Sequence, residues 1–210
     1  MTAAKDLILL SDTCEQYAVS AERDISDRQN DPRTMSLWNI RNRVRMSAEI
    51  LTFYERYWNS GSFPEVGEDL EGELVERIMT VTRDLFVDVV SAVEKAVKDC
   101  VKIYSASGLK EDALKMGSHL YLRNIIECSY RRGLIGKDTF GVWDDILTVR
   151  NLAAHNNSVS DRNRRCTIGG VTISMRAGRM MKGPLNTFIS LTATAVDLFY
   201  DWLVMMDSRF

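Results

Sequence analysis

The sequence has few of the residues that build metal sites or disulfide frameworks. Its 210 residues include four cysteines, and no two of them stand at CxxC or metal-ligand spacing. This scatter predicts free thiols in a reducing compartment. The chain has two histidines, and it contains no HExxH, P-loop, GxSxG or dinucleotide-binding motif. The sequence therefore predicts neither a bound metal nor a cofactor.

Long apolar runs and a strong net charge are also missing. No apolar run reaches 18 residues, and the N-terminal segment "MTAAKDLILLSDTCEQ" breaks its apolar stretch too early for a signal peptide. The net charge of −2 gives no global indication of nucleic acid as a partner. A composition of 45% hydrophobic and 27% charged residues is typical of a globular protein. We expect a soluble, cytoplasmic protein with no membrane partner.

Proline is rare, which leaves long stretches free to form helices. The three prolines, Pro32, Pro64 and Pro184, stand at expected element boundaries. Apolar residues at helical spacing predict helices over 3–23, 35–58, 70–104, 111–131, 139–155 and 184–207. "CTIGGVTISM", with β-branched residues around Gly169 and Gly170, predicts a short β-hairpin. The predicted fold class is all-α: one domain over 1–210, a bundle of about six helices with a small hairpin inserted before the last. Residues 1–107 would hold the N-terminal helices, and 111–210 the remainder.

The predicted helix over 139–155 carries an unusual polar stripe. Asp144, Thr148, Asn151 and His155 recur at i, i+4, i+7 and i+11, between two apolar rows. Arg150 lies on the flank, about 140° from His155, and its long side chain can curl toward that histidine or toward one from a neighbouring chain. The simplest interpretation is the solvated face of an amphipathic helix.

Residue chemistry and local charge favour a functional interpretation of this helix. Histidine carries protons near neutral pH and arginine clamps phosphate, which is what phosphodiester cleavage without a metal needs. Residues 150–182 hold seven arginines or lysines against one acid, whereas residues 65–99 hold ten acids against four bases. Such a concentration of positive charge predicts a polyanion partner. Arg162, Arg164 and Arg165 are the candidate RNA-binding residues; the alternative is a solvated loop and hairpin.

The segment "WDDILTVRNLAAHN" resembles the signature of the HEPN superfamily (higher eukaryotes and prokaryotes nucleotide-binding domain). Members of that family are all-α bundles with an R-x4-6-H motif, often beginning Arg-Asn, near the end of a helix. The preceding stretch "LRNIIECSYRRGLIGKDTFGVWDDIL" resembles the helix, turn and helix that lead to the motif in that family. The resemblance covers about residues 115–157, and it implies a HEPN-like helical bundle.

The resemblance implies a metal-independent endoribonuclease that acts as a homodimer. The helices that carry the motif in two subunits would face each other across a two-fold axis and form one cleft. By position, His155 would be the general acid or base, or would activate a ribose 2′-hydroxyl. Arg150 would hold the scissile phosphate, and Asn151 would orient it. The products would carry a 2′,3′-cyclic phosphate and a 5′-hydroxyl.

One position departs from the family pattern. A toxin subfamily has a tyrosine two residues after the histidine, which a partner nucleotidyltransferase modifies; Asn157 stands there, which excludes that form of control. We expect a ribonuclease of a toxin–antitoxin or antiviral defence system, with RNA and an antitoxin or other protein as partners. The alternatives are a non-catalytic helical dimer that binds RNA, a nucleotide or a protein through the same groove, and a purely structural bundle. Candidate accessory residues are Asp144, Thr148 and Glu127, although a helical salt bridge also suits Glu127.

Overall fold

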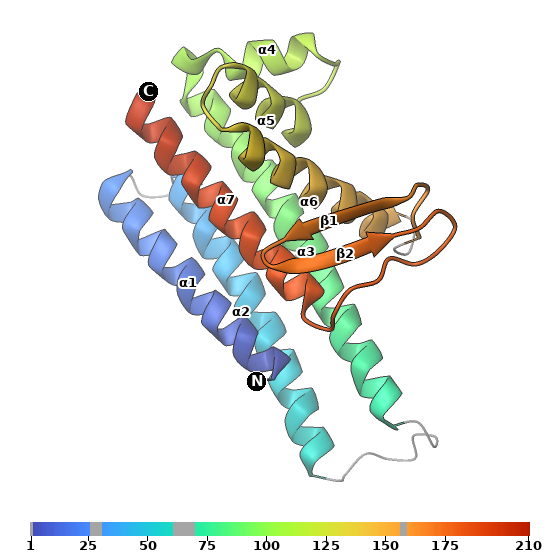
Figure 1. The fold of residues 1–210 in the computed structure, drawn as a ribbon. Coiled ribbons are helices and arrows are strands. Elements are labelled where there is room, and N and C mark those ends of the chain that lie inside the picture. The colour runs from blue at the N-terminus through green and yellow to red at the C-terminus, as the bar shows by residue number, and fades with distance from the viewer. Residues whose placement is uncertain (1, 26–30, 61–69, 156–158) are drawn as a thin grey trace.

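The computed structural model describes residues 2–25, 31–60, 70–155 and 159–210, and Figure 1 shows how they are arranged. The described part contains seven α-helices and one short 3-10 helix, η1 (Ser105–Ser107). The α-helices are α1 (Ala3–Asp24), α2 (Pro32–Asn59), α3 (Leu70–Ile103), α4 (Leu109–Lys115), α5 (Leu122–Arg131), α6 (Lys137–His155) and α7 (Thr187–Arg209). Strands β1 (Arg164–Ile168) and β2 (Val171–Met175) stand between α6 and α7.

Four long helices, α1, α2, α3 and α7, run side by side and form the frame of the molecule (Figure 1). Local signals in the sequence set the start of α2: the Asp31 side chain accepts a hydrogen bond from the Arg33 amide at 2.8 Å, and Pro32 is the first helical residue. Helical periodicity then directs one face of α2 inward, where Leu37, Ile40, Val44, Ala48 and Leu51 are buried. The predicted all-α architecture is confirmed at this level.

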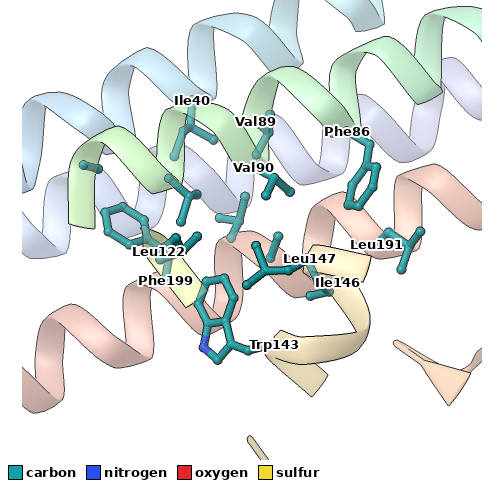
Figure 2. Packing of buried hydrophobic residues seen from close by; sticks show 14 of the residues in the cluster. Ile40, Phe86, Val89, Val90, Leu122, Trp143, Ile146, Leu147, Leu191 and Phe199 are labelled. Carbon is teal, nitrogen blue, oxygen red and sulfur yellow. The ribbon is translucent and has the colours of Figure 1, made fainter. Parts of the chain in front are cut away.

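Helix α6, which carries the RN…H residues, is anchored in the same core. Trp143, Ile146 and Val149 are fully buried, and Figure 2 shows Trp143, Ile146 and Leu147 among side chains of α3 and α7. Leu147 is also buried, whereas Ala154, two turns further along the same side of α6, is exposed. This packing holds the helix at a defined position against α3, α5 and α7.

Several helix boundaries differ from the predictions; α2, for example, begins at Pro32 rather than at residue 35. The single helix expected over 111–131 is wrong, because the chain forms α4 and α5 with a turn between them. Gly117 and Ser118 lie in that turn, and both residue types favour turns over helix interiors. The last helix begins at Thr187 rather than Pro184, since the Thr187 amide and hydroxyl both donate to the Pro184 carbonyl and form a turn before the helix. The described part therefore has seven helices where about six were expected.

The predicted β-hairpin is confirmed. Ile168 pairs with Val171 across a two-residue loop, in which Gly169 and Gly170 have φ values of 55° and 76°. A type I′ turn needs positive φ at both central residues, which is why two glycines stand there. The inner face of the hairpin is buried and packs on α6 and α7; its residues are Cys166, Ile168, Val171, Ile173 and Met175.

We expect Gly169→Ala to lower the free energy of unfolding by about 2 kcal/mol. A Cβ at Gly169 would lie 2.6 Å from Thr194 Oγ1 and 3.2 Å from the Ser190 carbonyl of α7, and a left-handed φ adds roughly 1–2 kcal/mol for an L-residue. Urea denaturation measures the loss. Gly170→Ala is the matched control, because Gly170 has the same kind of φ and no atom within 4 Å of its added Cβ. Equal losses in both variants would contradict a close contact between the hairpin tip and α7.

All four cysteines are free thiols, as the sequence predicted, and all four are buried. Burial raises the pKa of the Cys14 and Cys100 thiols to about 12 and that of Cys166 to about 11. Thiols with such values stay protonated near neutral pH, and a protonated thiol is a poor nucleophile and a poor metal ligand. The cysteines therefore act as small apolar core residues.

Of the described helices, α7 is the one whose length and composition would let it cross a membrane. Half of its most apolar window is buried inside the bundle (50%), including Phe188, Leu191 and Phe199. Helix α7 contacts α1, α3 and α6 as a core helix does. The soluble, cytoplasmic location stays a prediction from the composition.

Candidate functional site

Arg150 projects from α6 toward α3. Its Nη2 donates to Ser91 Oγ at 3.0 Å, and its guanidinium lies 3.8 Å from the Glu94 carboxylate. Its Nη1 also donates to Asn151 Oδ1 at 3.1 Å. The side chain as a whole is 22% exposed. These contacts hold the predicted phosphate-binding group in one orientation at the junction of the two helices.

A pocket of about 340 Å³ opens beside Arg150, where α3, the start of α5 and α6 meet. Leu122 and Leu147 supply apolar surface, while Asn124 and Asn151 supply amide groups. The Tyr121 ring at its edge is half exposed. The residues that line the pocket are Glu94, Tyr121, Leu122, Arg123, Asn124, Leu147, Arg150 and Asn151. An aromatic face for stacking, amides for hydrogen bonding and an arginine for phosphate are the groups that bind an unstacked nucleotide.

His155 lies at the C-terminal end of α6 and is exposed. Among the described residues it makes no side-chain hydrogen bond or ion pair, and it is not one of the residues lining the Arg150 pocket. Within one chain, Arg150 and Asn151 line the pocket, whereas His155 stands one helical turn beyond Asn151, at the end of α6. Asn157, which stands where the toxin subfamily has a tyrosine, lies outside the described residues.

Arg164 lies on the inner face of the hairpin and is bound to acidic residues of α6. Its guanidinium forms ion pairs with Asp145 and with Asp144, the latter at 3.1 Å, and its Nη1 donates to Thr148 Oγ1 at 3.4 Å. Arg123 of α5 also pairs with Asp144. The predicted accessory residues Asp144 and Thr148 thus belong to a polar network that joins α5, α6 and β1. In this structure the Arg164 guanidinium binds two protein carboxylates, and its role in RNA binding stays a prediction.

The same network affects the acidity of Asp145. Burial raises the pKa of the Asp145 carboxyl above its usual value, and the positive charge of Arg164 opposes that rise. Arg164 is therefore the counter-ion that partly offsets the effect of burial on the pKa of this carboxyl.

Arg162 and Arg165, the other two candidate RNA-binding residues, are both exposed. Arg162 pairs with its neighbour Asp161 at 3.1 Å, an ion pair between two solvated side chains. Arg165 points to the outer face of β1, opposite to Arg164, because side chains alternate along a strand. Among the described residues Arg165 has no ion-pair partner. Its charge is therefore available to an external anion.

The remaining candidates have ordinary structural contacts. Glu127 pairs with Arg131 one turn later on α5, which confirms the helical salt bridge considered for it. His119 lies exposed in the turn before α5, where its ring and the Tyr121 ring meet edge to face with centroids 5.9 Å apart. Among the described residues, no group of three histidine, cysteine, aspartate or glutamate side chains is placed to hold a metal ion.

Four residues that help form the site did not stand out in the sequence. Ser91 and Glu94 are interspersed in the apolar pattern of α3, and Tyr121 and Asn124 flank the start of α5. The polar positions of α3 were a usable signal, since a buried helix seldom carries serine and glutamate three residues apart without partners. Local spacing does not say which helix supplies those partners.

Comparisons with protein-family models, with curated proteins and with solved structures found no match for the chain. HEPN membership stays a prediction based on residues 115–157.

Proposed function

We propose that the protein is a metal-independent endoribonuclease of the HEPN type that cleaves RNA by attack of a ribose 2′-hydroxyl. The observation that carries the proposal is the pocket at the α3–α5–α6 junction, where Arg150 and Asn151 stand beside the Tyr121 ring. A nucleotide stacked on Tyr121 would place its phosphate toward the Arg150 guanidinium. An arginine already held by Ser91 and Glu94 would stabilise charge on the phosphorane with little reorganisation. The expected setting is a toxin–antitoxin or antiviral defence system.

In this proposal, His155 transfers the protons. It would accept the proton of the attacking 2′-hydroxyl, or donate one to the departing 5′-oxygen. Because His155 lies outside the Arg150 pocket of its own chain, the complete site would combine Arg150 of one subunit with His155 of another. A homodimer with two-fold symmetry supplies that combination twice.

The test is cleavage of a mixed RNA by the purified protein in excess EDTA. The proposal expects fragments with 2′,3′-cyclic phosphate and 5′-hydroxyl ends, because the 2′-oxygen is the nucleophile. RNA of the same sequence with 2′-O-methyl riboses should remain intact. Cleavage that requires an added metal, or that proceeds on the methylated RNA, would contradict the mechanism.

We also expect a dimer at micromolar concentration, with the site shared between subunits. Sedimentation measures the first property, and a mixture of Arg150→Ala and His155→Ala proteins measures the second. If Arg150 works with His155 of the other subunit, each mixed dimer keeps one intact pair, so an equimolar mixture should recover about a quarter of wild-type cleavage. A monomer, or a mixture as inactive as its components, would contradict the shared site.

One observation favours the non-catalytic alternative. The Arg150 guanidinium already has three protein partners, Ser91, Glu94 and Asn151, which suits a structural or ligand-binding residue as well as a catalytic one. A binding module would retain 2′-O-methyl RNA or nucleotide in the same pocket and leave unmodified RNA uncut. The EDTA assay combined with a binding measurement therefore separates the two functions.

A further inference from the structure

The outer face of the hairpin is polar and extends onto a third segment of chain. Ser174 of β2 pairs with Arg165 of β1 on one side and with Lys182 on the other. The amides of Ser174 and Lys182 donate to each other's carbonyls at 2.9 Å. Side chains of directly opposed residues share a face, with Cβ atoms about 4.5–5.5 Å apart. Arg165, Ser174 and Lys182 therefore form a row in which a hydroxyl stands between two cations.

A turn after β2 adds two more cations to this face. The Arg179 amide donates to the Arg176 carbonyl at 3.0 Å, which closes a four-residue turn. Gly178 has φ of 71°, as the third position of a type II turn requires. The end residues of such a turn lie within about 7 Å at Cα. After the turn, Lys182 pairs with Ser174 of β2. This pairing holds the turn against the row of Arg165, Ser174 and Lys182.

These elements enclose a small pocket of about 120 Å³. Its lining residues are Ser174, Arg176, Arg179, Met180 and Lys182, and none of them is acidic. A pocket of this size has room for one phosphate group, which has five heavy atoms. The pocket therefore combines the size, the charge and a hydroxyl donor that a phosphate needs.

The cations of this pocket lack counter-ions, unlike the arginine on the opposite face of the hairpin. Among the described residues, Arg176, Arg179 and Lys182 form no ion pair, whereas Arg164 binds both Asp144 and Asp145. Like charges held this close repel one another, and an arrangement without internal acids is stabilised by a bound anion. The geometry points to a phosphate-binding subsite formed by Arg165, Ser174, Arg176, Arg179 and Lys182, which takes the backbone of single-stranded RNA.

This subsite lies near the end of α6, and its assignment to RNA rests on the proposed function. Met180 forms a bridge with Val159, which follows His155 by four residues. Four residues span at most about 14 Å between Cα atoms, so the subsite is close enough to hold the same RNA strand on one side of the reacting phosphate. Its role is to bind the flanking backbone, and it takes no part in proton transfer.

The test measures binding of a fluorescent 2′-O-methyl RNA of ten nucleotides, which cannot be cleaved by 2′-hydroxyl attack. Arg176→Gln with Arg179→Gln should weaken binding about 5- to 25-fold at 0.1 M salt, because one or two phosphate contacts are lost at about 0.7 in the salt slope each. The slope of log K against log salt should flatten by the same 0.7–1.4. Arg176→Lys with Arg179→Lys keeps the charge and should restore most of the affinity.

Arg56→Gln with Arg209→Gln is the matched control, since it removes two exposed arginines at the ends of α2 and α7 and should leave affinity and slope unchanged. A single-stranded DNA of the same length should lose as much affinity as the RNA, because phosphate is the group recognised. Wild-type affinity and slope in the glutamine variant would overturn the subsite, as would a wild-type protein that binds neither probe. If the proposed function is wrong and the subsite is right, unmodified RNA stays uncut while the glutamine variant still binds RNA more weakly than the wild type.

Discussion

His155→Ala is expected to abolish RNA cleavage and to leave the fold intact. A general acid or base contributes about 10²–10⁴-fold to the rate, so cleavage in EDTA should fall by that factor. His155 is exposed and makes no side-chain hydrogen bond or ion pair among the described residues, so its loss removes no packing. Substitutions at such surface positions usually change stability by less than about 0.5 kcal/mol. Circular dichroism and thermal melting should therefore match the wild type.

The chain supplies a matched control in His119, its other histidine. His119 is also exposed, in the turn before α5, and the proposed chemistry assigns it no proton transfer. His119→Ala should keep wild-type cleavage. Full activity of His155→Ala, or an equal loss in both variants, would contradict the assignment of His155 as the proton-transfer group.

Arg164→Ala is expected to lower the free energy of unfolding by about 2–3 kcal/mol. The substitution leaves the Asp145 and Asp144 carboxylates, each about a fifth exposed, without their shared cation. Removing one partner of a fully buried ion pair leads to losses of about 3–5 kcal/mol, and the partial exposure here reduces that figure. Arg123 still pairs with Asp144, so Asp145 accounts for most of the loss. Urea denaturation at neutral pH measures it.

The loss should shrink as the pH falls from 7 toward 4. The folded-state pKa of Asp145 is already raised by burial, and removing Arg164 raises it further. A carboxyl with a raised folded pKa binds protons more readily in the folded state, so its penalty is present at higher pH and disappears once it is protonated. A loss that is independent of pH would contradict this origin.

Arg165→Ala is the comparison for Arg164→Ala, one residue along the same strand. Arg165 faces solvent, so its removal should change stability by less than about 0.5 kcal/mol while weakening binding of the 2′-O-methyl RNA. A loss of stability in Arg164→Ala and a loss of RNA binding in Arg165→Ala would show that the two faces of β1 have different roles. Equal destabilisation by both would contradict the strand orientation.

Local patterns in the sequence determined the helices, the hairpin and its turn. Apolar spacing predicted the long helices, and the Gly169–Gly170 pair predicted the turn, because the backbone conformation at those positions depends on neighbouring residues. The alternation of Cys166 and Ile168 with Arg165 also indicates that Arg164 faces inward, whereas local charge alone predicts one RNA-binding set of three arginines. The break between α4 and α5 is likewise signalled by Gly117, because glycine disfavours a helix interior.

Tertiary structure alone decided which partners the site residues have. Helical periodicity places Arg150 on a face of α6, but it does not say that Ser91 and Glu94, more than fifty residues earlier, lie opposite that face. Likewise, the spacing of Arg176, Arg179 and Lys182 does not show that they line one pocket, because the pairing of Ser174 with Lys182 makes them neighbours. Spacing along a chain determines the direction of a side chain, whereas its neighbours depend on how separate elements pack to bury their apolar faces.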